Sequence, residues 1–195
     1  MNEPVDKKPL WDLMILALIF ILGGGYLAHL IQTSGGVEIR DLRFMSNEGK
    51  RMSALLYVPK GVSHKNPAPG IVATHGYINS RETKDGFAIE FARRGYVVLA
   101  IDQSGHGFSD PPSGGNGFGG LPALGYLRTL DFVDKDNIGI EGHSMGGWAS
   151  LKAAESNPDG YRSLILASSS TGTYGTKEGT PTFPRNTALI FSKYD

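Results

Sequence analysis

The stretch Gly142-His143-Ser144-Met145-Gly146-Gly147 follows an apolar run at residues 138–140 and precedes a helix-like segment at residues 148–154. This order predicts a strand, a sharp turn and a helix. In a Gly-x-Ser-x-Gly turn the serine adopts a strained backbone conformation, and the glycines remove side chains that would collide with the neighbouring strand and helix. Ser144 then lies exposed at a helix N-terminus, where the backbone N–H of Met145 can help to bind a developing oxyanion. The alternative reading is a glycine-rich turn with an N-capping serine.

The composition bounds the possible functions. Lysine plus arginine equals aspartate plus glutamate at 19 each, so no overall field attracts nucleic acid or acidic partners. Cysteine is absent, which excludes a thiol nucleophile, a disulfide framework and thiolate metal sites. The sequence has no His-x-x-x-His or comparable carboxylate spacing for a metal, and nothing in it indicates a nucleotide, so no cofactor is expected. A chain of 195 residues is long enough for one domain with a substantial core.

The N-terminal region divides into a polar tail at residues 1–9, an apolar segment at residues 10–31 and a flexible linker at residues 32–36. As a helix the apolar segment would be about 33 Å long, enough to cross a hydrocarbon core of about 30 Å. We expect a single-pass membrane anchor; a cleaved signal peptide and a buried helix are the alternatives. Lys7 and Lys8 precede the segment and the next basic residue is Arg40, which predicts a cytoplasmic N-terminus and an extracytoplasmic domain.

Residues 37–195 show the alternation of an α/β domain. The polar turn at residues 46–50 separates two strand-like segments, which predicts an antiparallel hairpin. A strand, a helix and a strand then follow in an order that predicts a right-handed parallel crossover. We expect a mostly parallel sheet with helices on both faces. Expected strands are 37–45, 52–58, 70–74, 96–101, 138–140, 162–167 and 188–191; expected helices are 82–94, 121–133 and the segment after Ser144.

Three other segments are expected to be irregular. Residues 111–120 are rich in glycine and proline, which predicts either a mobile loop near the site or an ordinary surface linker. Residues 134–137 are expected to form a solvated corner that leads into the strand before Ser144. Residues 168–184 are polar and are expected to form a loop.

Over residues 37–195 the pattern resembles the α/β-hydrolase superfamily, most of all its dienelactone-hydrolase, prolyl-oligopeptidase and acetyl-esterase branch. The spacing of several separate marks carries this resemblance more specifically than the serine motif alone. The marks are the hairpin end at residues 55–59, His75-Gly76, Arg94-Gly95-Tyr96 leading into Asp102, the segment at residues 105–110, and the run from Val133-Asp134 to the Gly142–Gly147 stretch.

The resemblance implies a role for four residues. Ser144 matches the nucleophile, and the backbone N–H groups of Met145 and Tyr77 match the two oxyanion donors. Asp195 follows the strand that usually precedes the acid of the catalytic triad, so it is the candidate acid; the alternative is an ordinary solvated aspartate. Together these residues imply a serine hydrolase that cleaves a small ester-like substrate through an acyl-enzyme.

The departure from the family pattern concerns the histidine base. In this family the order is Ser, then Asp or Glu, then His, and no residue follows Asp195. His75 and His143 are expected to orient the oxyanion turn or to pack against the nucleophile turn. We therefore expect either a fragment of a longer gene product or a degenerate member with little activity. The five histidines present are His29, His64, His75, His106 and His143.

Two rival functions stay open at this point. A peptidase, thioesterase or lactone hydrolase can use the same fold, because fold does not determine substrate. A membrane-tethered, catalytically inactive hydrolase domain could instead serve as a binding module. The sequence does not predict the acyl group, the leaving group or the oligomeric state.

Overall fold

The computed structural model describes residues 8–33, 35–112, 117–169, 176–177, 180–181 and 183–191. The chain separates into two compact units, Met1–Gly36 and Val37–Asp195. In the first unit, helix α1 (Lys8–Thr33) has 26 residues and exposes its apolar side chains along nearly its whole length. By length and composition α1 could cross a membrane, although a signal sequence near an N-terminus meets the same criteria.

In the described part of the second unit, seven strands form one sheet in the order β1-β2-β4-β3-β5-β6-β9. Strands β1 and β2 are antiparallel to each other, β2 is antiparallel to β4, and the pairs from β4 to β9 are parallel. This arrangement confirms the predicted mostly parallel sheet with an N-terminal hairpin. The strands are β1 (Val37–Met45), β2 (Arg51–Pro59), β3 (Ala68–Thr74), β4 (Val97–Ile101), β5 (Val133–His143), β6 (Ser163–Ala167) and β9 (Thr187–Ile190).

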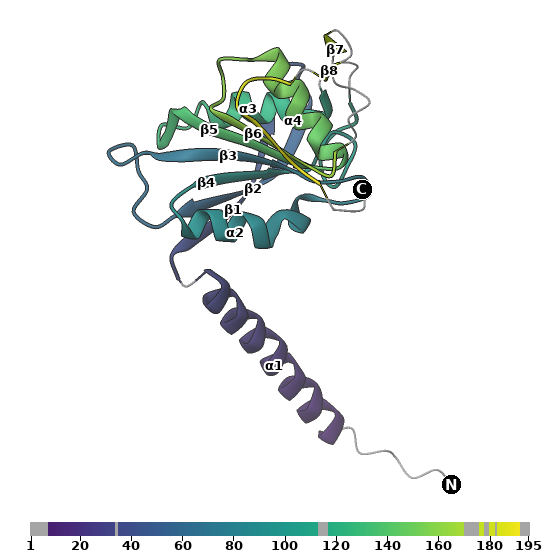
Figure 1. Ribbon diagram of the computed structural model, residues 1–195. Coiled ribbons are helices and arrows are strands. Elements are labelled where there is room, and N and C mark those ends of the chain that lie inside the picture. Colours follow the sequence, from purple (N-terminus) through teal and green to yellow (C-terminus); the bar gives the residue numbers. More distant parts are fainter. Residues whose placement is uncertain are drawn as a thin grey trace. The chain divides into compact units, whose positions relative to one another are not determined.

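Helices cover both faces of this sheet, as predicted (Figure 1). Helix α2 (Asp85–Arg93) packs against β4 and β2 on one face, while α3 (Gly120–Leu127) and α4 (Met145–Ser156) lie together on the other. The α3–α4 side holds the larger apolar cluster, with Leu56, Leu99 and Ile140 almost fully buried. A smaller cluster lies under α2. Because both faces of β3 and β4 are buried, these two strands are nearly continuous apolar runs.

The predicted helix at residues 121–133 was too long. Helix α3 ends at Leu127, and Val133 is already the first residue of β5, where it pairs with Ala68. Leu130 and Phe132 still pack against the core, but they do so from a turn, in which the N–H of Val133 donates to the carbonyl of Leu130 (3.2 Å). The regular spacing of apolar residues over 121–133 therefore indicates which residues contact the core, but it does not show that they form one continuous helix.

Three other expectations are corrected. The predicted helix at 82–94 begins as a 3₁₀ turn, η1 (Arg81–Lys84), before α2. The charged corner at 134–137 is exposed to solvent at residues 135–137, as predicted, but it lies inside β5 as a bulge, because the pairing with β3 steps from Pro69↔Asp134 to Gly70↔Ile138. The stretch 168–184, predicted as loop, contains a two-stranded pair, β7 (Thr176–Lys177) with β8 (Thr180–Pro181).

Parallel strands bring the chemistry-bearing segments to one edge of the sheet. β4, β3, β5 and β6 are neighbours that point the same way, so the loops after them meet at their carboxyl ends. In open α/β sheets this edge is where ligands bind. The segments that follow β3, β4 and β5 begin at His75, Asp102 and Ser144.

Candidate active site

Ser144 occupies the turn between β5 and α4. Its backbone angles are φ 53° and ψ −119°, in the left-handed half of conformational space that L-residues rarely adopt. The amide of Ser144 donates to the carbonyl of Ala167 on β6 (2.9 Å), and the carbonyl of Ser144 accepts from the amide of Gly147 (2.9 Å). The predicted strand, strained turn and helix are thus confirmed. Strain of this kind costs about 1–3 kcal/mol and persists where the surroundings enforce it.

Two glycines make this turn possible by close backbone approach. A Cβ atom on Gly142 would collide with the backbone of Gly146 and with the hydroxyl of Thr74. One on Gly146 would collide with the carbonyls of Thr74 and His75. The Thr74 hydroxyl lies between these segments, within 2.7 Å of the carbonyl of Gly146 and 3.0 Å of that of Glu141. The end of β3 and the start of α4 therefore touch through main chain.

The His75-Gly76-Tyr77 turn lies directly against the nucleophile turn. An atom at the Cβ position of Gly76 would be 3.6 Å from Cβ of Ser144 and 3.2 Å from Nδ1 of His143. Met145 is the first residue of α4, where backbone N–H groups have no partner within the helix. The structure thus brings the segments of Tyr77, Ser144 and Met145 together, as the family resemblance implied.

His75 is a structural residue of this turn. Its ring is fully buried, Nδ1 lies 2.7 Å from the carbonyl of Gly76, and Nε2 accepts the backbone N–H of Gln103 at 3.0 Å. This pattern requires a neutral ring with the proton on Nδ1. Burial lowers the pKa of His75, which favours the same state. Because both ring nitrogens are engaged, His75 orients the turn and is not available to take a proton from Ser144.

The other histidines of the domain are placed differently. His106 is half-buried, with Nδ1 3.3 Å from the carbonyl of Ser104 and its ring edge-on to His75 and Tyr77. His143 is exposed beside the nucleophile turn, and His64 is exposed in the loop after β2. Within the described residues, no hydrogen bond joins a histidine to Ser144.

Buried ion pairs fix the segment that follows the oxyanion turn. The side chain of Arg81 is 4% exposed and contacts Asp102 (3.7 Å) and Asp41 (2.8 Å). Lys84 forms an ion pair with Glu141, the residue before Gly142, and the two side chains are only 10% and 5% exposed. Burial raises the pKa of Glu141, and the charge of Lys84 opposes that rise. η1 is thereby tied to β4 on one side and to β5 on the other.

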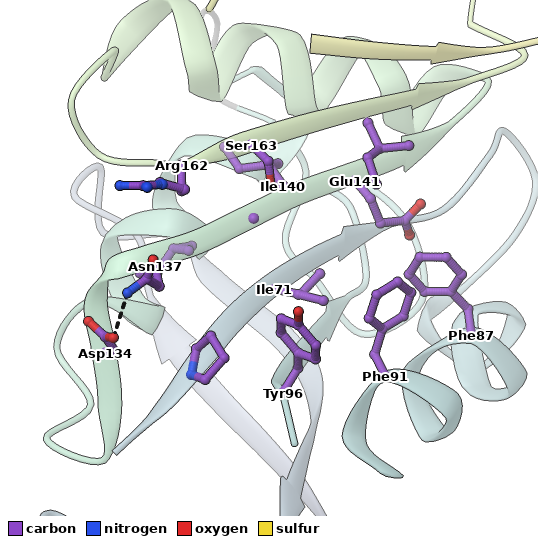
Figure 2. Close-up of a pocket in the computed structure, with 14 residues that line it drawn as sticks. Ile71, Phe87, Phe91, Tyr96, Asp134, Asn137, Ile140, Glu141, Arg162 and Ser163 are labelled. Atoms are coloured by element: carbon purple, nitrogen blue, oxygen red, sulfur yellow. Dashed lines mark hydrogen bonds between the residues drawn. The ribbon is translucent and has the colours of Figure 1, made fainter. Parts of the chain in front are cut away.

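Two of the hollows near β5 differ in chemistry. A small one of about 270 Å³ is lined by Ser144, Met145, Trp148 and Phe118. A larger one of about 440 Å³ lies between α2 and the sheet, where Figure 2 shows the rings of Phe87, Phe91 and Tyr96 near Glu141. The described lining of the larger hollow includes neither Ser144 nor the turn of Tyr77, so the candidate site is the smaller one.

Sequence reasoning missed Phe118 and Trp148. Trp148 carried a signal, because it lies four residues after Ser144 and therefore on the same side of α4. Phe118 carried none, since it belongs to the glycine- and proline-rich segment; the structure places it in η2 (Gly117–Gly119) beside the candidate site. Residues 113–116 of that segment and Asp195 lie outside the described residues, although the strand predicted ahead of Asp195 is confirmed as β9.

The described residues contain no group of three histidine, aspartate or glutamate side chains that could hold a metal ion. The groups assembled at the site are instead a hydroxyl, main-chain amides at a helix start and apolar side chains. A nucleophile turn of this kind on a mostly parallel sheet, next to a turn of the oxyanion type, defines the α/β-hydrolase class of protein.

Comparison with known proteins gives the family. The family described as serine aminopeptidase, S33, matches residues 65–193. The chain belongs to this family, within the α/β-hydrolase superfamily. It is 33% identical over 100 residues to an uncharacterized protein of Mycobacterium tuberculosis, a match that covers 51% of this chain and 29% of that protein. It is 32% identical over 107 residues to a 2-(acetamidomethylene)succinate hydrolase of Mesorhizobium japonicum, covering 53% and 37%.

Solved structures agree on the fold. A hypothetical protein from Pseudomonas aeruginosa superimposes with a TM-score of 0.61 at 25% identity, covering 70% of this chain and 44% of that one. An acetyl xylan esterase from Paenibacillus sp. R4 gives a TM-score of 0.62 at 22% identity, covering 70% and 50%. The matched region thus spans 29–37% of the curated relatives named above and 44–50% of the solved chains.

Proposed function

We propose that this protein is a serine hydrolase that cleaves an ester-like bond through an acyl-enzyme on Ser144. The observation that carries the proposal is the strained backbone of Ser144 at the start of α4, with Gly76 of the oxyanion-type turn packed against it. Membership of a hydrolase family supports it, as do the hydrolase and esterase names of similar proteins.

In the proposed mechanism the oxygen Oγ of Ser144 forms a bond to the carbonyl carbon of the substrate and gives up its proton to a base. The carbonyl electrons move onto oxygen, and the backbone N–H groups of Met145 and Tyr77 donate hydrogen bonds to that oxyanion. The carbonyl re-forms as the bond to the leaving alkoxide breaks, and the alkoxide takes up the proton. Water then repeats the sequence and releases the acid.

The base in this proposal is a histidine that a carboxylate orients, and Asp195 is our candidate for that carboxylate. We assign none of the histidines of residues 1–195 to this role. His75 is excluded by its two ring hydrogen bonds, and the family order puts the base after the acid. Oxyanion binding without a base gives roughly 10³- to 10⁴-fold acceleration over water, so we expect residues 1–195 assayed on their own to hydrolyse esters slowly.

A fluorophosphonate probe and p-nitrophenyl acetate test the proposal together. We expect the probe to label the full chain slowly, because no base is assigned within residues 1–195. The Ser156→Ala variant, whose exposed serine lies at the far end of the same helix, should label equally, and Ser144→Ala should not label. We expect slow release of p-nitrophenol, and Ser144→Ala should be slower because it lacks the acyl-enzyme route and keeps only oxyanion stabilisation. Equal, high rates in all three proteins would remove Ser144 from the mechanism, and absence of labelling even after long exposure would favour an inert binding module.

We also propose that α1 anchors the protein in a membrane with its N-terminus in the cytoplasm. The length and apolar composition of α1 support an anchor, and the positions of Lys7 and Lys8 ahead of it support the orientation. Protease added outside intact cells, after the outer barrier is opened, should digest the domain. Complete protection of the domain would contradict this topology.

A further inference from the structure

The described lining of the hollow beside Ser144 is mostly apolar. Apart from Ser144 itself, its described walls are the side chains of Phe118, Met145 and Trp148, and none of these carries a charge. Met145 and Trp148 come from the first turn of α4, so the helix that carries the nucleophile also sets their backbone positions. A charged group placed here would lose its hydration without gaining a partner from these walls.

Phe118 also lines this hollow, but it belongs to η2 rather than to α4. The fold holds its backbone in an uncommon conformation. Its φ of 57° is rare for an aromatic residue, and its carbonyl accepts the backbone N–H of Ser104 at 3.0 Å. On its other side, Gly120 lies so close to α4 that a Cβ atom there would collide with the carbonyl of Ala149. The aromatic wall is therefore fixed both to the loop after β4 and to the elbow helix. Strain kept at a site in this way indicates a function.

We propose that this hollow is the binding site for an uncharged alkyl or aryl group of the substrate, on the acyl or leaving side of the bond that Ser144 attacks. The inference rests on the proposed hydrolase function and adds the class of substrate to it. A volume of about 270 Å³ is large enough for a short alkyl chain or one aromatic ring. Phe118, Met145 and Trp148 determine specificity in this scheme.

A binding experiment that does not depend on catalysis tests the proposal. The chain has two tryptophans, Trp11 and Trp148, so the Trp11→Phe variant leaves Trp148 as the sole reporter of the hollow. The full-length variant in a mild detergent is titrated with N-methylalkanamides from acetamide to octanamide, whose amide stands in for the ester. An N-methylalkanamide of the same length ending in a carboxylate is the charged comparison.

We expect the emission of Trp148 to change on titration and the dissociation constant to fall by up to about fourfold for each added methylene, until the hollow is full. In the same background, Phe118→Ala should weaken binding of N-methylhexanamide by about tenfold. Phe108→Ala, which removes an exposed aromatic ring that does not line this hollow, should not weaken it. The carboxylate series should bind more weakly at every length.

The results also separate this inference from the proposed hydrolysis. Binding that ignores chain length, or a carboxylate series that binds as tightly as the neutral one, would overturn the apolar site even if a fluorophosphonate labels Ser144. Chain-length-dependent binding that persists in Ser144→Ala supports the apolar site. If the fluorophosphonate fails to label while this binding stays intact, the hydrolase proposal falls and the apolar site stands.

Discussion

The buried ion pair between Lys84 and Glu141 should make the two single substitutions behave differently. Glu141→Gln leaves the Lys84 ammonium, only 10% exposed, without its partner. Removing one member of a buried pair costs about 3–5 kcal/mol of unfolding free energy, because an uncompensated charge stays buried. We expect Glu141→Gln to lose that amount at neutral pH.

Lys84→Met should instead give a loss that depends on pH. Burial raises the pKa of Glu141 above its value of 4.5 in the unfolded chain. Folding therefore favours protonated Glu141, and the folding stability that this contributes is fully present below pH 4.5 and is lost as pH rises through the folded-state pKa. Without Lys84 that pKa rises further. The variant should therefore be close to the parent in stability below pH 4.5 and lose at most about 1.4 kcal/mol per pH unit above it.

The double variant Lys84→Met/Glu141→Gln removes both charges and should lie within about 1 kcal/mol of the parent, because uncharged replacements of a buried pair are often neutral. Urea unfolding of the full chain in detergent at pH 4 and pH 7, in the Trp11→Phe background and followed through Trp148, measures all four proteins. Single variants whose losses simply add in the double variant would refute the reasoning, since they would show that the two charges do not interact.

Three further results are expected. Gly146→Ala places a Cβ against the carbonyls of Thr74 and His75 and should lower the free energy of unfolding by at least about 1–3 kcal/mol. Gly125→Ala, in open space on α3, should raise it by up to about 1 kcal/mol. Urea unfolding measures both variants. The hydrogen bond from Arg81 lowers the pKa of Asp41 from 3.8 to about 2, so the folding stability that this carboxylate contributes is lost as pH falls between those values. Asp41→Asn should flatten that part of an acid unfolding curve followed by circular dichroism. An unchanged slope would contradict the reasoning. Added imidazole should speed p-nitrophenyl acetate cleavage by this chain more than by Ser144→Ala, because it can take the serine proton; equal acceleration would leave Ser144 without a role.

Much of the fold could be predicted because the residue pattern of most segments favours the same strand, helix or turn that the tertiary structure contains. The polar turn at residues 46–50 gave the hairpin, and the apolar runs ahead of His75, Asp102 and the nucleophile turn gave β3, β4 and β5. The positions of Gly142 and Gly146 around a serine predict close main-chain approach, which the structure shows. The extent of α3 was wrong because Leu130 and Val133 meet the core from a turn and from a strand, which periodicity does not distinguish from a helix.

Within the site, the sequence by itself determined the segments that meet: a serine turn before a helix and a His-Gly turn after a parallel strand. Only the tertiary structure decided what surrounds them. The state of His75 follows from contacts with Gln103 and Gly76, and the apolar wall at Phe118 follows from its anchoring to the loop after β4 and to α4. Such contacts join residues far apart in the chain, and no local pattern of residue types records which of them burial will bring together.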